Sequence, residues 1–207
     1  MKSYTFFLDN ISVNEFFKPI RSRSHAIERT LRALKLMGLN PKIPKTSIKG
    51  ELRLYIDKMN RIFFYTENKY FTLNFPFSVQ GTINEMKFYS DYLGVIDNKK
   101  SSDLLALINS GVQNEECIDA FYDKFCDVVE YNVEIWNEFR RLIQLEDGYI
   151  RYDHDPINED NDIHPLNHLD IFYSQSSTIK IGLKNKFSKD ELIDSVNIKT
   201  NCKYLYY

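Results

Sequence analysis

Three of the four histidines in this 207-residue chain lie among carboxylates between residues 151 and 170. Alternate side chains of an extended segment point to opposite faces, so Arg151 and Asp153 would share one face while His154 lies on the other. The same rule places His168 and Asp170 together on a second extended segment. If the two segments pair as a hairpin, we expect Arg151, Asp153, His168 and Asp170 to meet at one place.

These residue types suit acid–base cleavage of a phosphodiester. The forked donors of Arg151 match two phosphate oxygens. His168 is the candidate general base, because a neighbouring carboxylate, Asp170 or Asp153, fixes its tautomer and stabilises the imidazolium. With His154 or His164 as the acid, the set predicts cleavage of RNA without a metal ion.

The same residues also fit a divalent metal site. Imidazoles from His154, His164 and His168, with Asp153 or Asp170, are ligands that zinc, manganese or iron accept. The spacing contains no HExxH motif, and the acidic run at 153–162 lacks the central glycine of an EF-hand. No resident cofactor is predicted, and a divalent metal ion is kept as an alternative.

A third interpretation gives this stretch no chemistry. A hairpin with a solvated acidic tip would have the same composition, with Arg151 paired to Asp170 or Asp153 across the strands. Exposed ion pairs of that kind typically contribute under about 1 kcal/mol to stability. A functional site therefore requires that these side chains converge at a place that solvent reaches.

One block of the sequence resembles a known family. The segments RYDHDP at 151–156, HPLNHLD at 164–170 and TIKIGL at 178–183 look like the end of a bacterial family known only as a domain of unknown function. The resemblance covers roughly the last 60 residues. It implies a prokaryotic source and a role in a mobile or defence gene cluster, and it carries no activity and no residue roles.

Charge is distributed unevenly along the chain. Residues 18–53 contain ten lysines and arginines against two glutamates, whereas residues 146–170 contain eight carboxylates against Arg151 alone. Such polarity predicts a nucleic-acid face, a partner face, or two parts of the fold that attract each other. The residues predicted to contact RNA or DNA are Arg21, Arg23, Arg29, Arg32 and Lys35.

Periodicity predicts a helix first and then a meander of strands. Ser24 is the expected N-cap of a helix over 25–37 that closes at Gly38. The basic residues on one face of this helix either contact phosphate or form an ordinary solvated surface. Runs rich in tyrosine, phenylalanine, isoleucine and leucine, separated by polar turn residues, predict antiparallel strands at 52–57, 61–66 and 70–75. Pro76 is expected to end the third strand or to place it at an edge.

The rest of the chain predicts more helices and a second group of strands. Short helices are expected at 84–93 and 102–109, and one helix of about 30 residues over 114–145, with Cys117 and Cys126 as packing residues. Strands follow at 149–153, 168–174 and 178–183. Ser188 and Glu191 have capping-box spacing, so a last short helix should follow.

Together these patterns predict an α+β fold, with antiparallel sheets packed on the long amphipathic helix. We expect one domain over residues 1–207, with 1–112 and 113–207 as candidate sub-lobes. Three unpaired cysteines, no signal-peptide core and no bilayer-length apolar run favour a cytoplasmic protein without membrane contact. No Walker A, GxGxxG or GxSxG motif occurs, which disfavours nucleotide-driven chemistry.

Two classes of function remain open on the sequence. The first is a nuclease-like effector of a defence or toxin–antitoxin type system, guided to its substrate by the basic N-terminal third. The second is a non-catalytic subunit or antitoxin-like partner, which binds a protein encoded in the same gene cluster through its helix and its charged parts. A metal-dependent hydrolase is the third alternative.

Overall fold

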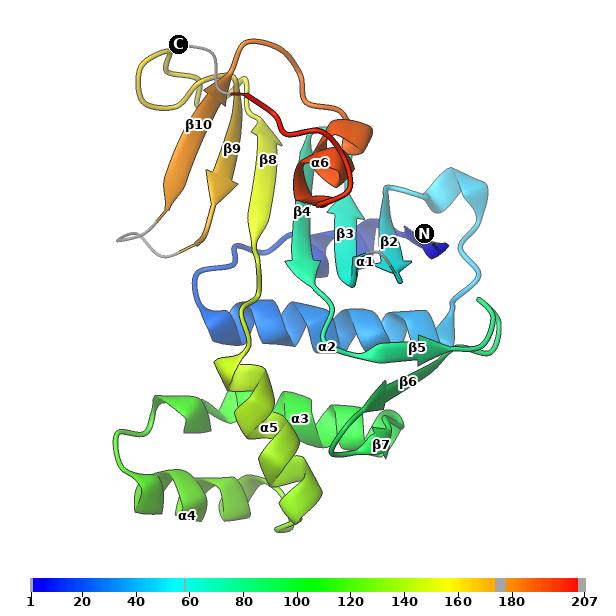
Figure 1. The fold of residues 1–207 in the computed structure, drawn as a ribbon, viewed down its shortest axis with the longest axis vertical. Coiled ribbons are helices and arrows are strands. Elements are labelled where there is room, and N and C mark those ends of the chain that lie inside the picture. The colour runs from blue at the N-terminus through cyan, green and yellow to red at the C-terminus, as the bar shows by residue number, and fades with distance from the viewer. Residues whose placement is uncertain (1, 58, 174–177, 205–207) are drawn as a thin grey trace.

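The structure is a computed structural model that describes residues 2–57, 59–173 and 178–204. Six α-helices, a seven-stranded antiparallel sheet and a three-stranded sheet make up this part of the chain, which confirms the α+β class. The large sheet has the order β1-β2-β3-β4-β8-β9-β10 (Figure 1). Its strands are β1 (Lys2–Leu8), β2 (Gly50–Ile56), β3 (Arg61–Tyr65), β4 (Lys69–Asn74), β8 (Ile150–His154), β9 (Asn167–Ile171) and β10 (Ile179–Leu183).

The predicted meander is confirmed in β2, β3 and β4, and Pro76 lies just beyond the end of β4. β4 is not an edge, because β8 pairs with it and continues the sheet into β9 and β10. The predicted division after residue 112 therefore runs through one sheet. Residue 58 of the first predicted turn and residue 174 at the end of the predicted strand 168–174 lie outside the described residues.

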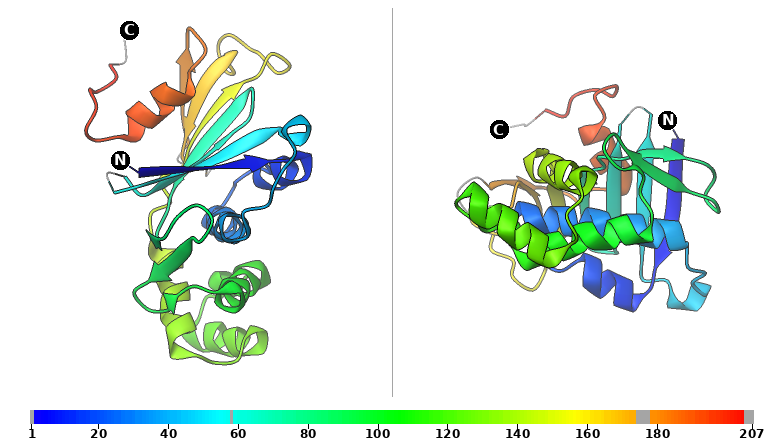
Figure 2. Two further views of the ribbon diagram at one scale, coloured as in Figure 1. Left: turned by 90° about the vertical axis from the view of Figure 1, so that its right-hand side faces the viewer. Right: turned by 90° about the horizontal axis from the view of Figure 1, so that it is seen from below.

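Helices cover both faces of the large sheet (Figure 2). On one face, α1 (Asn10–Phe16) and α2 (Arg23–Leu39) contribute Phe16, Leu31 and Leu34 to a core that includes Phe64 and Phe71. On the other face, α6 (Lys189–Val196) contributes Leu192 and Ile193 to a smaller cluster with Phe63 and Tyr65. The predicted capping box of Ser188 and Glu191 begins α6.

The ends of α2 differ from their prediction. Ser22 caps the helix by accepting a hydrogen bond from the His25 backbone N–H, so the helix begins two residues before the expected position. At the other end the helix passes through Gly38, and Asn40 takes the left-handed conformation with φ of 41°. Asparagine is the residue that most readily replaces glycine in this role.

The helix predicted at 84–93 is wrong. This region belongs to the small sheet, which consists of β5 (Ser78–Gln80), β6 (Lys87–Ser90) and β7 (Gly94–Val95). In β6 the buried side chains Phe88 and Ser90 alternate with Lys87 and Tyr89, as in a strand with one face on the core. The helix predicted at 102–109 is confirmed within α3 (Asn98–Ser110).

The single long helix predicted over 114–145 is also wrong. The chain forms two helices, α4 (Ile118–Val128) and α5 (Val133–Gln144). The Asn132 side chain caps α5 by accepting from two backbone N–H groups. Rings on the two helices then meet, with Phe121 and Phe125 each 5.1 Å from Trp136 between centroids. The apolar stripe therefore joins α4 to α5 instead of covering the sheet.

Helices α3, α4 and α5 form a separate helical layer. α3, α4 and α5 lie together beyond α2, on the side away from the sheet (Figure 1). A continuous apolar core joins this layer to the sheet layer through α2, with Leu107, Phe125 and Phe139 in the same cluster as Leu31 and Phe64. Among the described residues, none of the helices combines the length and the hydropathy that a bilayer crossing requires.

Candidate functional site

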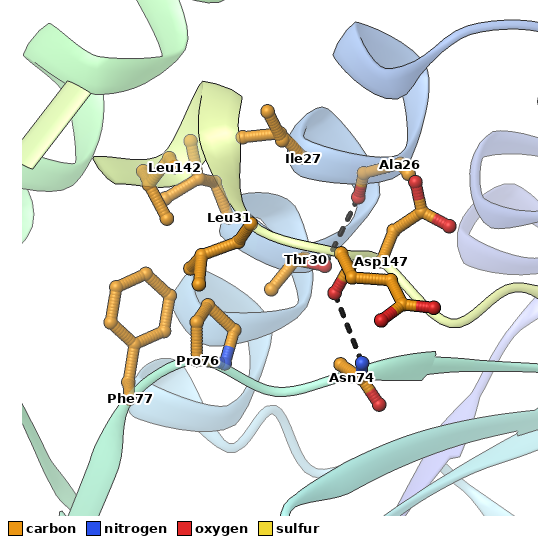
Figure 3. A pocket seen from close by; sticks show the side chains of 11 residues that line it. Ala26, Ile27, Thr30, Leu31, Asn74, Pro76, Phe77, Leu142 and Asp147 are labelled. Atoms are coloured by element: carbon orange, nitrogen blue, oxygen red, sulfur yellow. Dashed lines mark hydrogen bonds between the residues drawn. The ribbon is translucent and has the colours of Figure 1, made fainter. Parts of the chain in front are cut away.

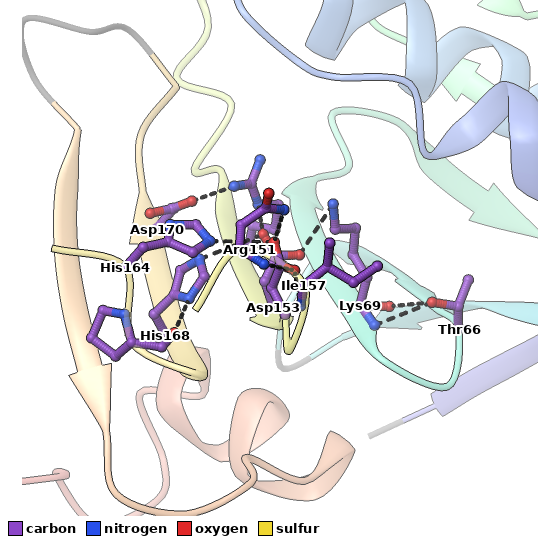
Figure 4. A network of polar contacts seen from close by, with 11 residues as sticks. Thr66, Lys69, Arg151, Asp153, Ile157, His164, His168 and Asp170 are labelled. Carbon is purple, nitrogen blue, oxygen red and sulfur yellow. Dashed lines mark hydrogen bonds and ion pairs between the residues drawn. The ribbon is translucent and has the colours of Figure 1, made fainter. Parts of the chain in front are cut away.

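The predicted polar cluster forms on the β8–β9 hairpin. The two strands are antiparallel, with Arg151 opposite Asp170 and Asp153 opposite His168. Because residues directly opposite each other share a face, these four side chains lie together (Figure 4). Arg151 is also opposite Phe71 of β4, so the cluster lies on the sheet face that α1 and α2 cover.

Ion pairs hold the carboxylates of the cluster. Arg151 Nε lies 2.7 Å from Asp153 Oδ2, and Arg151 Nη2 donates a hydrogen bond to Asp170 Oδ2. Lys69, which opposes Asp153 across β4 and β8, places its Nζ 3.2 Å from Asp153 Oδ1. Burial works to lower the pKa of Arg151, but Tyr149 and the two carboxylates raise it overall. Two buried carboxylates are thus balanced by two cations.

His168 is completely buried, and one of its nitrogens is already engaged. Nδ1 lies 2.8 Å from the carbonyl oxygen of Pro165, so Nδ1 carries a proton and donates it. In the neutral ring, Nε2 then presents a lone pair toward Asp153 Oδ2, 3.7 Å away, and it has no hydrogen-bond partner among the described residues. A lone pair that faces a carboxylate is unfavourable unless a proton or a metal ion lies between them.

Three atoms of the cluster converge as a ligand set. Asp153, His168 and Asp170 each offer one ligand atom, and these atoms all lie within 4.8 Å of one another. His168 Nε2 and Asp170 Oδ1 are buried and lack a hydrogen-bond partner in the described part of the chain, whereas Asp153 Oδ1 is buried and contacts only the ammonium of Lys69. The three residues therefore form a group that could hold a metal ion. It differs from the set expected from the sequence, because within the described ranges His168 is the one histidine in it and both aspartates belong to it.

His164 lies beside this group without joining it. Its ring centroid is 4.4 Å from that of His168, while its Nε2 lies 3.3 Å from Asp155 Oδ2 and its Nδ1 lies 3.3 Å from Lys180 Nζ. Hydrogen bonds from the side chain and the backbone of Asn158 lower the pKa of Asp155. His164 is thus positioned to form an outer contact to the cluster.

His154 does not reach the cluster. It points to the opposite face of the hairpin, where its Nδ1 lies 2.9 Å from Oδ1 of Asn167. The same amide oxygen accepts a hydrogen bond from the Tyr152 hydroxyl. His154 therefore serves neither as the acid nor as a metal ligand of this cluster. Alternate side chains of a strand point to opposite faces, so His154 cannot share a face with its neighbour Asp153.

Solvent reaches the cluster beside Arg151. A small pocket of about 40 Å³, here called the Arg151 pocket, lies between the hairpin and the segment that joins α1 to α2. The Arg151 side chain is 26% exposed, whereas that of His168 is fully buried. Residues that line the Arg151 pocket include Phe17, Lys18, Lys69, Phe71, Tyr149 and Arg151.

The predicted basic stripe on α2 is not a free phosphate-binding face. Arg29 is 3% exposed and pairs with Glu28, which also binds Arg32 at 2.8 Å. Lys35 donates a hydrogen bond to Ser102 on α3. Of the two remaining candidates, Arg23 donates to the Ile143 carbonyl of α5 and Arg21 is exposed. These contacts show that most of the stripe is already engaged, either with Glu28 of the same helix or with α3 and α5.

A second recess is apolar and lies between the layers. It measures about 140 Å³ and is lined mainly by Ala26, Ile27, Leu31, Pro76, Phe77 and Leu142 (Figure 3). Thr30 and Asp147 in its wall already bond to protein atoms: Thr30 Oγ1 donates to the Ala26 carbonyl, and the Asp147 carbonyl accepts from the Asn74 N–H. The Asp147 carboxylate accepts from the Tyr149 N–H and the Tyr173 hydroxyl. This recess therefore lacks a convergent set of free polar groups.

The three cysteines are all exposed. The expectation that Cys117 and Cys126 pack on a long helix is thus wrong, because the helix breaks into two and its buried stripe is aromatic. Cys117 instead caps α4, with its sulfur accepting from the Ala120 N–H.

The chain was also compared with known proteins. Comparison with models of protein families, with curated proteins and with solved structures finds no match. The resemblance of the C-terminal block to a bacterial domain of unknown function, and the defence role that it implies, therefore stay predictions.

Two parts of the site were not anticipated from the sequence. Lys69 joins the cluster because β4 pairs with β8, and Lys18 approaches it because the α1–α2 segment crosses the end of the hairpin. A single sequence carries no signal for either contact, since both depend on strand order and on long-range packing. The contact between His168 and the Pro165 carbonyl joins residues only three positions apart, so the HPLNH segment was a local sequence signal for it.

Proposed function

We propose that this protein is a divalent-metal-dependent hydrolase whose metal centre consists of Asp153, His168 and Asp170. The observation that carries the proposal is the buried Nε2 of His168, which faces the Asp153 carboxylate with Asp170 close by, while Nδ1 bonds to a backbone carbonyl. Metal-binding histidines almost always donate their other N–H to a carbonyl, a carboxylate or water. The cluster has the donor set and this supporting contact.

The donor types suggest which ions fit. One imidazole and two carboxylates suit zinc, manganese or iron(II) better than calcium or magnesium, which prefer oxygen ligands alone. Three protein ligands leave coordination positions for water. A bound divalent ion lowers the pKa of that water and so supplies a hydroxide nucleophile near neutral pH, which is the reason for proposing hydrolysis.

Charge sets a condition on metal binding. Arg151 and Lys69 already neutralise the two carboxylates, so an entering ion competes with both cations. We expect Arg151 to withdraw from Asp153 and Asp170 when the ion binds. Its partly exposed side chain gives it room to turn toward the Arg151 pocket.

Metal-free cleavage of RNA has less support. A general base must come within roughly 2.6–3.2 Å of the proton it abstracts, directly or through one water. His168 is fully buried with Nδ1 already bonded, and His154 lies on the other face of the hairpin. RNA is retained as one substrate to be tested with the metal-loaded protein.

The first experiment measures metal binding by calorimetry after chelation and buffer exchange. We expect one zinc or manganese ion per chain, and an affinity at least tenfold lower, roughly, in His168→Gln and Asp170→Asn. His154→Gln is the matched control, because it removes an imidazole from the same hairpin on the opposite face. If the wild-type chain binds neither zinc nor manganese nor iron(II), the proposal is ruled out.

The second experiment measures hydrolysis of RNA and of simple phosphate esters by the metal-loaded chain. We expect cleavage that stops on addition of EDTA and is lost in Asp170→Asn. Cleavage that survives chelation would contradict metal dependence and would return support to the acid–base mechanism.

A non-catalytic protein-binding module is the second candidate function. Ile118, Tyr122, Tyr131 and Val133 on and between α4 and α5 are large, apolar and exposed. Exposed apolar surface of this kind is typical of contacts with other proteins. A chain that binds no divalent ion and cleaves no phosphate ester under any metal condition would fit this candidate instead.

A further inference from the structure

We infer that the Arg151 pocket is a phosphoryl-binding subsite of the proposed metal centre, so that the substrate is a phosphate ester and metal ion and phosphate bind cooperatively. The inference rests on the proposed function and adds to it the class of substrate. It begins from the fact that one pair of side chains, Arg151 and Lys69, contacts Asp153 and also lines the pocket.

The position of the pocket places a ligand next to the ligand set. The Arg151 guanidinium bonds both carboxylates of the cluster, so a molecule in the pocket lies against the same guanidinium. The volume of about 40 Å³ suits a group of a few atoms better than a ring or a base. A single phosphoryl group fits this limit, with the remainder of the ester lying outside in solvent.

The walls of the pocket have the chemistry that a phosphoryl group needs. Lys18, Lys69 and Arg151 line it, with Lys18 also paired to Glu15 and the other two to the cluster carboxylates. Guanidinium forks match two phosphate oxygens. Its floor is apolar, with the rings of Phe17 and Phe71 in edge contact at 5.2 Å. An apolar floor lowers the local dielectric and so strengthens the attraction between an anion and these cations.

The charges of the cluster explain why the two ligands should favour each other. In the metal-free cluster, Asp153 and Asp170 are balanced by Arg151 and Lys69. A divalent cation on the carboxylates leaves two positive charges uncompensated and releases the guanidinium toward the pocket. A phosphate dianion restores neutrality, and linkage then requires that each ligand tighten the other by the same factor.

The basic residues of α2 favour a small phosphate ester as the substrate over a long polynucleotide. Arg29 is buried, Arg32 pairs with Glu28, and Lys35 bonds to α3, so these cations do not continue the pocket along the surface. The experiment therefore uses inorganic phosphate first, then a phosphomonoester and a short RNA. The last two distinguish a terminal phosphate from a phosphodiester as the source of the phosphoryl group.

The test is a set of titrations by calorimetry with manganese alone, inorganic phosphate alone, and each in the presence of the other. We expect phosphate to bind at least about fivefold tighter to the manganese-loaded chain, and manganese to tighten by the same factor with phosphate. Lys18→Met should weaken the binding of phosphate to the manganese-loaded chain at least about fivefold, because it removes one cation from the pocket. The affinity for manganese alone should stay unchanged, because Lys18 pairs with Glu15 and not with the ligand set. Lys184→Met, at an exposed lysine, is the matched control.

The outcomes separate this inference from the proposed function. Manganese that binds normally, with a phosphate affinity that does not depend on it, would overturn the subsite and leave the metal centre intact. Equal phosphate affinities of the manganese-loaded Lys18→Met and Lys184→Met chains would also overturn it. Absence of manganese binding with and without phosphate would reject the metal centre, and the subsite with it. If the phosphomonoester alone tightens manganese binding, the subsite is supported and takes a terminal phosphate. If the RNA tightens manganese binding as well, the subsite is supported and also takes a phosphodiester.

Discussion

At the scale of single residues, the site depends on Arg151. One guanidinium contacts two nearly buried carboxylates that would otherwise repel each other. Removing one partner of a buried ion pair is costly because the remaining charge stays desolvated. A bound divalent ion would supply the same compensation at the same carboxylates.

This gives a prediction for Arg151→Met. We expect the free energy of unfolding of the metal-free protein to fall by about 3 kcal/mol, and saturating zinc or manganese to recover much of that loss. Urea denaturation with and without the ion measures both values. Arg21→Met removes an exposed arginine and is the control, so it should change the free energy of unfolding by less than about 0.5 kcal/mol. A loss for Arg151→Met that the ion leaves unchanged would argue against a metal site at these carboxylates.

At the scale of elements, the sequence predicted faces better than it predicted boundaries. Alternation placed Arg151, Asp153, His168 and Asp170 on one face of a hairpin, and their register confirms it. The same local rule found the β2–β4 meander. Helical periodicity failed over 114–145, because a stripe that recurs every three or four residues shows which face is buried and gives no sign of a break between two helices.

The break before α5 leads to a second prediction. Asn132 accepts hydrogen bonds from the Glu134 and Ile135 backbone N–H groups at 2.8 and 3.2 Å. Asn132→Ala should therefore lower the free energy of unfolding by about 1 kcal/mol through loss of the cap. Denaturation followed by tryptophan fluorescence reports on this helix, because Trp136 is the single tryptophan of the chain. An equal effect from Asn185→Ala, at an exposed loop position, would contradict a capping role.

At the scale of the whole molecule, one sheet contains strands from both halves of the chain. β4 and β8 are neighbours although the small sheet and α3 to α5 lie between them in sequence. That pairing brings Lys69 to Asp153 and fixes the position of the hairpin against the α1–α2 segment. Single-sequence patterns are local, so they identified the hairpin and could not identify the neighbours that complete the site.

The continuous core predicts how the layers unfold. Because Leu31, Phe64 and Phe139 belong to one apolar cluster, we expect the sheet and the helical layer to unfold together in a single transition. Trp136 fluorescence follows the helical layer, and far-ultraviolet circular dichroism follows the whole chain. The two denaturation curves should coincide. A fluorescence change at lower urea concentration would show that α3 to α5 unfold separately.

We expect the apolar recess between α2, Pro76 and Leu142 to make this fold sensitive to compression. Apolar space that is poorly packed in the folded state is eliminated on unfolding, so the volume of the system decreases when the chain unfolds. High hydrostatic pressure should therefore favour the unfolded state, to a degree that scales with this unfilled space. Larger side chains that fill the recess would make the protein more barotolerant.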